Sequence, residues 1–362
     1  MAYTTINKSS SFMNIKLHSG TGSTTTITGV GFEPSLTWWK SRNNIVNNAV
    51  YDAVRGASKL IRSNQSTQEQ TNAAVSAFTS DGVTLTGGDS FTNASGYTYA
   101  SWNWKANGAG SANTDGSISS TVSANTTSGF SIVKYDGAAG AYGTVGHGLG
   151  VTPKMIMVKR LDSADDWDVY TYNLPTGTNG AGSYLSLNSS STYSDNSNRW
   201  YNTPPTNNVF TVGDANTVNG SGKSYVAYCF ANVQGHQKIG GYTGNNPAGG
   251  TNTQFVYTGF RPKLVMLKEI SGTSNWVIYD LNRNYSLTEN NYNIRAARLA
   301  WNSDNAESSF TDDHGIDILS NGFNIRDNSN DLYTINANNE TYVYYAVGQT
   351  LVGTNNVPNN AV

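Results

Sequence analysis

The sequence predicts an all-β protein made of three consecutive homologous units, each a β-sandwich or jelly-roll-like fold. Three observations support this prediction. Strand-forming and turn-forming residues dominate the composition, with 22 Tyr and 37 Gly among 362 residues. A proline-led apolar motif occurs three times, and a tyrosine follows each proline at the same distance of 17 residues. The hydrophobic fraction of 37% is sufficient for packed cores, so we do not expect a disordered chain.

The first motif of each unit combines a proline, a mostly apolar run and a lysine six positions beyond the proline. It reads GFEPSLTWWK at 31–40, GVTPKMIMVK at 150–159 and GFRPKLVMLK at 259–268. The prolines are Pro34, Pro153 and Pro262, which lie 119 and 109 residues apart. Short, continuous apolar runs are typical of a strand that is covered on both faces. Each motif therefore predicts a central strand of a sandwich.

Further segments recur in the same order around this motif. These are opening strands (15–20, 133–137, 240–244), a tyrosine motif (49–51, 167–170, 276–279), a mid-unit element (60–64, 185–188, 299–302), a late strand (81–85, 208–212, 321–325) and a closing strand (98–104, 224–230, 341–347). Clusters of Gly, Asn and Asp at the strand ends are typical of hairpin turns. Helical signal is sparse: residues 51–62 and 292–299 are each either a short helical segment or a loop.

The recurring segments divide the chain into unit one (1–116), unit two (117–236) and unit three (237–362). A unit of this size can bury its own core. The first join, at 106–116, is small and polar and predicts a flexible connection. The second join, near Gly235, is short, so we expect units two and three to pack closely. The sequence leaves open whether the units surround a pseudo-threefold axis or form a row.

Charge and cysteine content exclude several classes of protein. The chain has 22 basic and 24 acidic residues, so no net positive field attracts nucleic acid or an anionic membrane. No apolar run approaches the roughly 20 residues of a membrane span, so membrane insertion is not expected. The first residues lack the apolar segment of a signal peptide, which predicts a protein made in a cytoplasm. The single cysteine, Cys229, excludes a disulfide framework and is expected to be a small buried residue.

The sequence predicts no catalytic residue, no cofactor and no metal site. The histidines do not occur in ligand-like pairs, and His147 in a glycine-rich turn is expected to be a loop residue. Two acidic segments, 162–168 and 312–317, are either solvated loops or oxygen-rich calcium sites. The repeated lysines at 40, 159 and 268 are expected to extend to solvent or to cap a sheet end. The tyrosines at 51, 170 and 279 are expected at the edge of the core, with a local partner for each hydroxyl.

Aromatic residues in polar stretches are the candidate contacts for a ligand or a partner. They are Trp200, Tyr201 and Tyr193 in unit two and Trp301 in unit three. Aromatic side chains on Asn-rich loops can stack on sugars or dock a protein, and they can equally fill a core. We expect these four side chains to be exposed.

Several segments resemble repeat-domain virion proteins of marine tailed bacteriophages. They include the opening MAYTTINKSS, the first-unit motif TGVGFEPSLTWWK, VRGASK at 54–59, NWKANG at 103–108, NTDGSI at 113–118, TVSANTT at 121–127 and TVGHGLG at 144–150. The resemblance covers most of residues 1–235 and fades in unit three. The family has no assigned activity, so no functional residue is transferred. It implies a virion location, either in a tail fibre or appendage or as a capsid decoration.

The leading hypothesis is therefore a non-enzymatic virion structural protein, made in the host cytoplasm and oligomeric in the particle. It would dock on other virion proteins through one unit and expose the others. The alternative is a carbohydrate-binding adhesin that recognises a host surface glycan. A third possibility is a depolymerase or glycosidase that depends on a carboxylate such as Asp166 or Asp313.

Overall fold

The computed structural model describes residues 4, 6–138, 140, 142–247, 251–283, 294–309, 315–326 and 333–350. These residues form an all-β fold of antiparallel sheets. Its helices are single short turns, such as α1 (Asn216–Asn219), and none of those in the described residues could span a bilayer.

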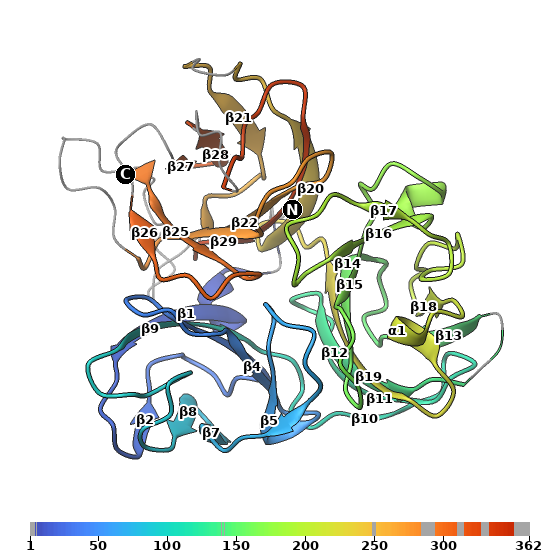
Figure 1. Ribbon diagram of the computed structural model, residues 1–362, viewed down its shortest axis with the longest axis horizontal. Coiled ribbons are helices and arrows are strands. Elements are labelled where there is room, and N and C mark those ends of the chain that lie inside the picture. The colour runs from blue at the N-terminus through green and yellow to red at the C-terminus, as the bar shows by residue number, and fades with distance from the viewer. Residues whose placement is uncertain are drawn as a thin grey trace.

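Figure 1 shows three lobes placed around a common centre. We call them the first lobe (13–104), the second lobe (111–231) and the third lobe (237–348).

The first lobe is a two-layer sandwich. Its large sheet has the order β1-β9-β3-β4-β5-β6 and its small sheet the order β2-β8-β7. The large sheet consists of β1 (Met13–Ser19), β9 (Thr98–Trp104), β3 (Leu36–Ser41), β4 (Ala49–Asp52), β5 (Gly56–Ile61) and β6 (Gln70–Thr71). The small sheet consists of β2 (Thr25–Ile27), β8 (Gly82–Leu85) and β7 (Val75–Thr79). A buried cluster that includes Tyr51, Val83 and Tyr99 fills the space between the two layers.

The second lobe has a large sheet of eight strands, ordered β10-β11-β12-β19-β14-β15-β16-β17, and a two-stranded sheet, β13-β18. The strands are β10 (Ser111–Asn113), β11 (Ser120–Asn125), β12 (Phe130–Asp136), β19 (Ser224–Ala231), β14 (Pro153–Arg160), β15 (Asp168–Thr171), β16 (Ser183–Ser186), β17 (Ser194–Asp195), β13 (Gly143–Gly146) and β18 (Val209–Val212). In the large sheet of the first lobe, the first strand in the chain lies at one edge, the last strand lies beside it, and the strands between them in the chain follow in order. The strands from β12 to β17 are arranged in the same way, and β10 and β11 extend the sheet beyond β12.

The third lobe has a large sheet ordered β20-β29-β22-β23-β25-β26 and a small sheet ordered β21-β28-β27-β24. The strands are β20 (Gln237–Thr243), β29 (Thr341–Gly348), β22 (Pro262–Glu269), β23 (Val277–Asp280), β25 (Ala297–Ala300), β26 (Ser308–Ser309), β21 (Gln254–Tyr257), β28 (Gly322–Ile325), β27 (Ile316–Leu319) and β24 (Ile294–Arg295). The strand order of the large sheet again corresponds to that of the first lobe.

The central strands β3, β14 and β22 are covered on both faces, as their apolar runs predict. Side chains on one face of β14, such as Met155 and Met157, enter a core that all three lobes share. The alternate residues Ile156 and Val158 enter the core of the second lobe itself. The expectation that each unit buries its own core is thus incomplete, because the inner faces of all three large sheets also pack against one another.

Two local predictions differ from the structure. The segment 106–116 was expected to be a flexible connection, but it contains β10, which pairs with β11. Residues 51–62 form the end of β4, a turn and β5, and the described part of 292–299 forms β24 and most of β25. The described residues of both segments are therefore not helical. In each case, pairing with a neighbouring strand satisfies backbone groups that the local sequence leaves unassigned.

The first and last described residues of the chain meet beside the join of the second and third lobes. The Thr4 hydroxyl donates to the Gln234 carbonyl over 2.6 Å. The Thr350 hydroxyl donates to Ser10 Oγ over 2.9 Å. The described chain therefore runs once around the three lobes and returns to its start.

Candidate functional site

Two of the predicted contact residues are buried, so the expectation that they are exposed was wrong. Trp200 is 2% exposed and lies in the core of the second lobe. Trp301 is 1% exposed and stacks on Trp38 of the first lobe, with ring centroids 4.0 Å apart. The polar residues around both indoles in the sequence do not reveal that other strands cover them.

The other two predicted contact residues have different surroundings. Tyr193 is half-buried, packs against the shared core, and donates its backbone N–H to the Ile270 carbonyl of the third lobe. It therefore contacts a neighbouring lobe and does not form an open platform. Tyr201 is 45% exposed, as expected, and stacks on Tyr142 with ring centroids 4.6 Å apart.

Tyr142 is 57% exposed and was missed by the sequence analysis. It lies in the small-residue segment Gly137–Gly143, where an aromatic ring has few local packing partners, and this was the available signal. The Tyr201 backbone has a φ of 52° and that of Asn202 a φ of 51°, which is unusual for residues other than glycine. Strained backbone of this kind is often retained where it presents a functional side chain.

The three repeated lysines are buried, which corrects the expectation that they extend to solvent. Each lies at the end of a central strand and donates to a backbone carbonyl of another lobe. Lys40 Nζ reaches Asp304 O at 2.9 Å, Lys159 Nζ reaches Ser66 O at 3.2 Å, and Lys268 Nζ reaches Ser190 O at 3.1 Å. We call these three contacts the lysine ring, because the first lobe contacts the third, the third contacts the second, and the second contacts the first.

Burial is the main cause of the lowered pKa values of the three lysines in the lysine ring. It lowers the pKa of Lys40 and of Lys268 to about 7 and that of Lys159 to about 8. Each ammonium also donates to carbonyls of its own lobe, such as Asp165 O at 2.9 Å from Lys159 Nζ. The three lysines therefore donate hydrogen bonds to buried backbone carbonyls at all three boundaries between lobes.

Buried ion pairs strengthen two of these boundaries. Asp52 pairs with Arg55 at 2.5 Å and accepts a hydrogen bond from the hydroxyl of Tyr228, a residue of the second lobe. Asp280 pairs with Arg283 at 2.7 Å and accepts a hydrogen bond from the indole of Trp102, a residue of the first lobe. The second lobe has Thr171 and Leu174 at the corresponding positions after its motif tyrosine. The second lobe therefore has no Asp–Arg pair at these two positions.

The remaining reactive residue types are engaged in structural contacts. Cys229 is buried as expected, and burial raises the pKa of its thiol to about 12. The Leu149 N–H donates to His147 Nδ1, so His147 Nε2 donates to the Thr206 carbonyl. Burial lowers the pKa of this imidazole. The hydroxyls of Tyr51 and Tyr170 have the local partners that were expected, Asn72 and the Asn179 carbonyl.

Each carboxylate of 162–168 has a partner in an ion pair or a hydrogen bond. Asp162 and Asp165 both pair with Arg160, Asp168 pairs with Arg199, and Asp166 accepts from Asn188. In the second acidic segment, Asp312, Asp313 and His314 lie outside the described residues, whereas Asp317 pairs with Arg326. Within the part of the chain that is described, no three His, Cys, Asp or Glu side chains gather as metal ligands would.

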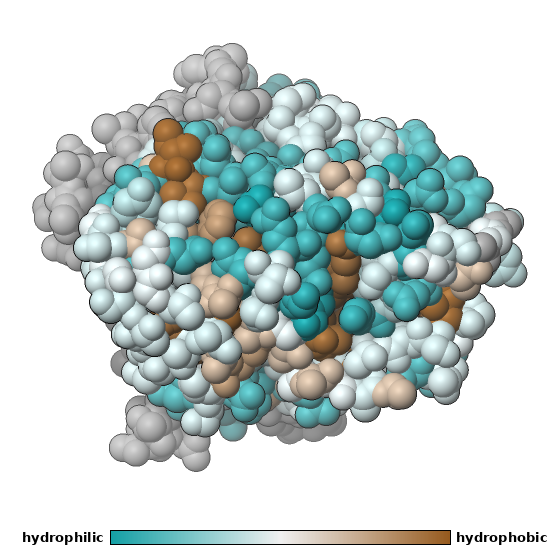
Figure 2. Space-filling view, turned by 60° about the horizontal axis from the view of Figure 1, so that its bottom comes forward, coloured by the Kyte–Doolittle hydropathy of each residue, from teal (hydrophilic) through white to brown (hydrophobic). Residues whose placement is uncertain are grey.

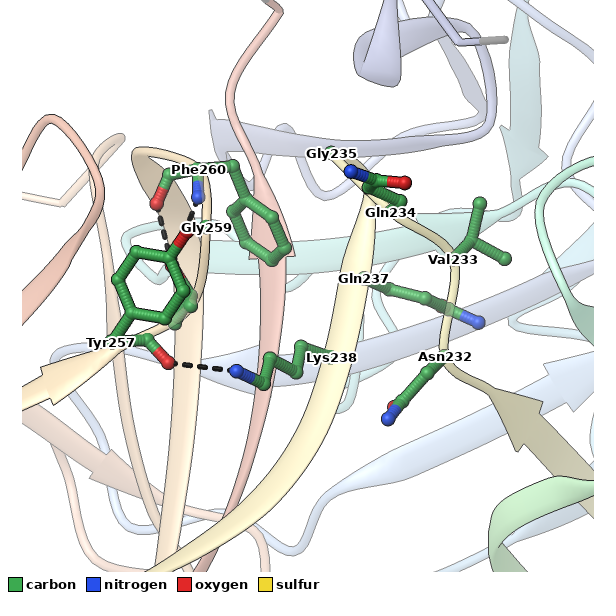
Figure 3. Close-up of a pocket in the computed structure, with 10 residues that line it drawn as sticks. Asn232, Val233, Gln234, Gly235, Gln237, Lys238, Tyr257, Gly259 and Phe260 are labelled. Carbon is green, nitrogen blue, oxygen red and sulfur yellow. Dashed lines mark hydrogen bonds between the residues drawn. The ribbon is translucent and has the colours of Figure 1, made fainter. Parts of the chain in front are cut away.

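A pocket of about 330 Å³ opens where the second lobe leads into the third. Figure 3 shows the segment 232–238 on one side and Tyr257–Phe260 on the other. Lys238 Nζ donates to the Tyr257 carbonyl over 2.9 Å and lies 5.1 Å from the centre of the Tyr257 ring. Tyr257 is 55% exposed, and Phe255, two residues earlier on β21, is 44% exposed. The sequence does not reveal this pocket, because the fold brings the segment that joins the second and third lobes beside Tyr257–Phe260, about 20 residues further along the chain.

One face of the molecule is mainly polar. Figure 2 shows one face on which hydrophilic and neutral residues predominate and hydrophobic residues form small, separate patches. Scattered patches of this kind are normal on a soluble surface.

A family model described as "Domain of unknown function (DUF7483)" matches residues 8–350. The chain belongs to this family. The match spans all three large sheets, so the DUF7483 domain comprises the three lobes together. No curated protein matches the chain.

Proposed function

We propose that the three lobes are homologous units arranged around a pseudo-threefold axis, with boundaries near 1–116, 117–236 and 237–362. The common strand order of the three large sheets supports this proposal. So do Pro34, Pro153 and Pro262, which lie just before or at the start of the corresponding strands β3, β14 and β22. The lysine ring adds a chemical correspondence, because the same residue of each lobe makes a contact with another lobe.

We further propose that the chain is a non-enzymatic structural protein of a virion surface, in a tail appendage or a capsid decoration. The lysine ring is the observation that carries this proposal, because its three contacts join every lobe to the other two lobes of the same chain. The outer surfaces of the lobes are then available for other proteins. One lobe docks on other virion proteins and the others face outward. The sequence resemblance to marine phage virion proteins supplies the setting.

Localisation in purified particles tests this function. We expect an antibody against the chain to label intact virions, and a particle reconstruction to contain a three-lobed density of matching shape. A parallel preparation from uninfected cells controls for adhering host protein. Absence of the chain from gradient-purified virions would overturn the proposal.

One observation favours the second candidate, a carbohydrate-binding adhesin. Tyr142 and Tyr201 form an exposed stacked pair on a backbone with left-handed φ at Tyr201 and Asn202. Aromatic faces held in this way suit the stacking of a sugar ring. The two candidates are compatible, because a virion surface protein can also bind a host glycan.

A further inference from the structure

The pocket at the join of the second and third lobes combines three properties of a binding site. It is concave, with a volume of about 330 Å³, which lies within the range of small-ligand sites. Its walls come from two segments that the fold brings together, 232–238 and Tyr257–Phe260. It lies away from the Tyr142–Tyr201 pair, which belongs to the second lobe alone.

Lys238 is the single charged residue among those that line the pocket. Its ammonium donates to one carbonyl and faces one aromatic ring, so two of its three N–H groups remain available. Burial lowers its pKa, and no carboxylate contributes to that shift. A partly buried cation without a counter-charge favours an anionic group in the pocket beside it.

The rest of the lining is neutral and suits a polyhydroxylated ligand. The Tyr257 ring is more than half exposed and offers an aromatic surface, while Phe260 is buried behind it. Gln234 and Asn232 are exposed at the opposite wall and carry amide groups. The Asn232 amide already bonds to the Ile239 backbone through Oδ1 and Nδ2, so it keeps one N–H and one lone pair for a ligand. Figure 3 shows the Gln234 and Asn232 side chains on the side of the pocket opposite Tyr257. An aromatic face with amides opposite matches the apolar face and hydroxyl groups of a sugar ring.

We propose that this pocket binds a saccharide that carries a carboxylate, with Lys238 pairing with the carboxylate and Tyr257 stacking on the sugar ring. Gln234 and Asn232 donate to and accept from the hydroxyl groups. The inference goes beyond a virion location and does not depend on it, because binding is a property of the isolated chain. It also supplies a site separate from the Tyr142–Tyr201 pair.

The test is a titration of the full chain with short oligoglucuronates and, in parallel, with glucose oligomers of the same length. We expect saturable binding of the acidic oligomers by calorimetry and at least tenfold weaker binding of the neutral ones. Lys238→Met should weaken the binding of oligoglucuronate at least tenfold, and Tyr257→Ala at least fivefold. Lys238→Arg should retain affinity within about threefold, since the charge is kept.

Lys154→Met is the matched control. Lys154 lies over the Tyr172 ring at 4.8 Å, so it reproduces the lysine–tyrosine pair of the pocket at another place in the fold. This variant should bind as the unchanged chain does, and the thermal midpoints of all variants should agree within a few degrees. Absence of binding to oligoglucuronate, equal affinity for the neutral oligomers, or binding that survives Lys238→Met would each overturn the proposal. None of these outcomes bears on whether the chain is present in virions, which the particle experiment decides.

Discussion

At the residue scale, the large side chains that hold the lobes together combine an apolar body with one polar donor. The Trp167 indole donates to the Arg62 carbonyl of the first lobe, and the Trp276 indole donates to the Ser186 carbonyl of the second. At the corresponding position, Asn48 of the first lobe donates to the Trp301 carbonyl of the third. Each donor adds a hydrogen bond across a boundary between lobes, where leaving a buried donor without a partner costs about 1–3 kcal/mol.

His236 predicts how stability depends on acidity. Its Nδ1 lies 2.5 Å from Ser9 Oγ, and burial, together with the nearby charge of Lys263, lowers its pKa to about 3. In the unfolded chain, histidine titrates near 6.5. Between about pH 6.5 and pH 3, the unfolded state therefore binds a proton that the folded state does not. This group's contribution to stability is lost as the pH falls, by up to about 1.4 kcal/mol per pH unit.

Urea denaturation of the unchanged chain and of His236→Gln at several pH values from about 7 to 4 isolates this effect. Asp168, whose pKa burial raises to about 6, acts with the opposite sign but is present in both proteins, so it cancels in the difference. The free energies of unfolding of the two proteins should converge, or cross, as the pH falls. A difference that stays constant with pH would contradict the prediction.

At the element scale, each of the central strands β3, β14 and β22 contributes side chains to two cores and to one boundary between lobes. Alternate side chains enter the shared core and the core of their own lobe, and the lysine near the strand's end contacts another lobe. The period of two along a strand makes this division strict, because a shift of one residue would exchange the two faces. Each central strand therefore fixes both the sandwich and its position against its neighbours.

Removal of one member of the lysine ring should destabilise the molecule. Lys159→Met leaves the carbonyls of Ser66 and Asp165 without this donor, so we expect a loss of about 1–3 kcal/mol in the free energy of unfolding at neutral pH. Lys134→Met is the control, because Lys134 is exposed on β12 and should change stability by no more than about 0.5 kcal/mol. Equal stability of the two variants in chemical denaturation would show that the ring contacts contribute nothing.

The sequence was sufficient to place the central strands, because their signals are local, but not strands such as β10 and β5. The apolar runs after Pro34, Pro153 and Pro262 correspond to β3, β14 and β22, and the polar turns correspond to strand ends. It was not sufficient to place side chains that depend on distant segments. Trp301 stands between an apolar pair and a polar stretch, and the sequence does not show that its ring lies on Trp38, more than 250 residues away. The lysines seemed to be solvated strand ends for the same reason, since the carbonyls that cover them belong to other lobes.

In the candidate site too, the sequence identifies side chains with a local signal and misses those whose surroundings come from other strands. Tyr201 was identified because it is an aromatic residue in a polar stretch, and its exposure is observed. Lys238 and Tyr257 carried no signal, because their pairing depends on the way β20 of the large sheet lies beside the end of β21 of the small sheet in the third lobe.

At the scale of the whole molecule, the largest buried cluster belongs to no single lobe. It includes Trp102 and Trp104 from the first lobe, Phe230 from the second and Tyr345 from the third. Trp104 donates its indole N–H to the Tyr345 hydroxyl over 3.0 Å at this centre. A lobe separated from the others would expose the inner face of its large sheet to water, at about 25 cal/mol for each Å² of apolar area.

The full chain should therefore unfold in one cooperative transition. Calorimetry should give a single peak, with the van't Hoff and calorimetric enthalpies in agreement. A fragment that covers the second lobe alone, residues 117–236, should remain unfolded or associate, since half of its central-strand side chains lose their partners. Two or three resolved transitions, or a stable monomeric fragment, would contradict a shared core.

The meeting of Thr4 with Gln234 and of Thr350 with Ser10 means that the order of the lobes along the chain is not imposed by the fold. A circularly permuted gene that began with the second lobe and linked the original ends would encode the same set of packed surfaces.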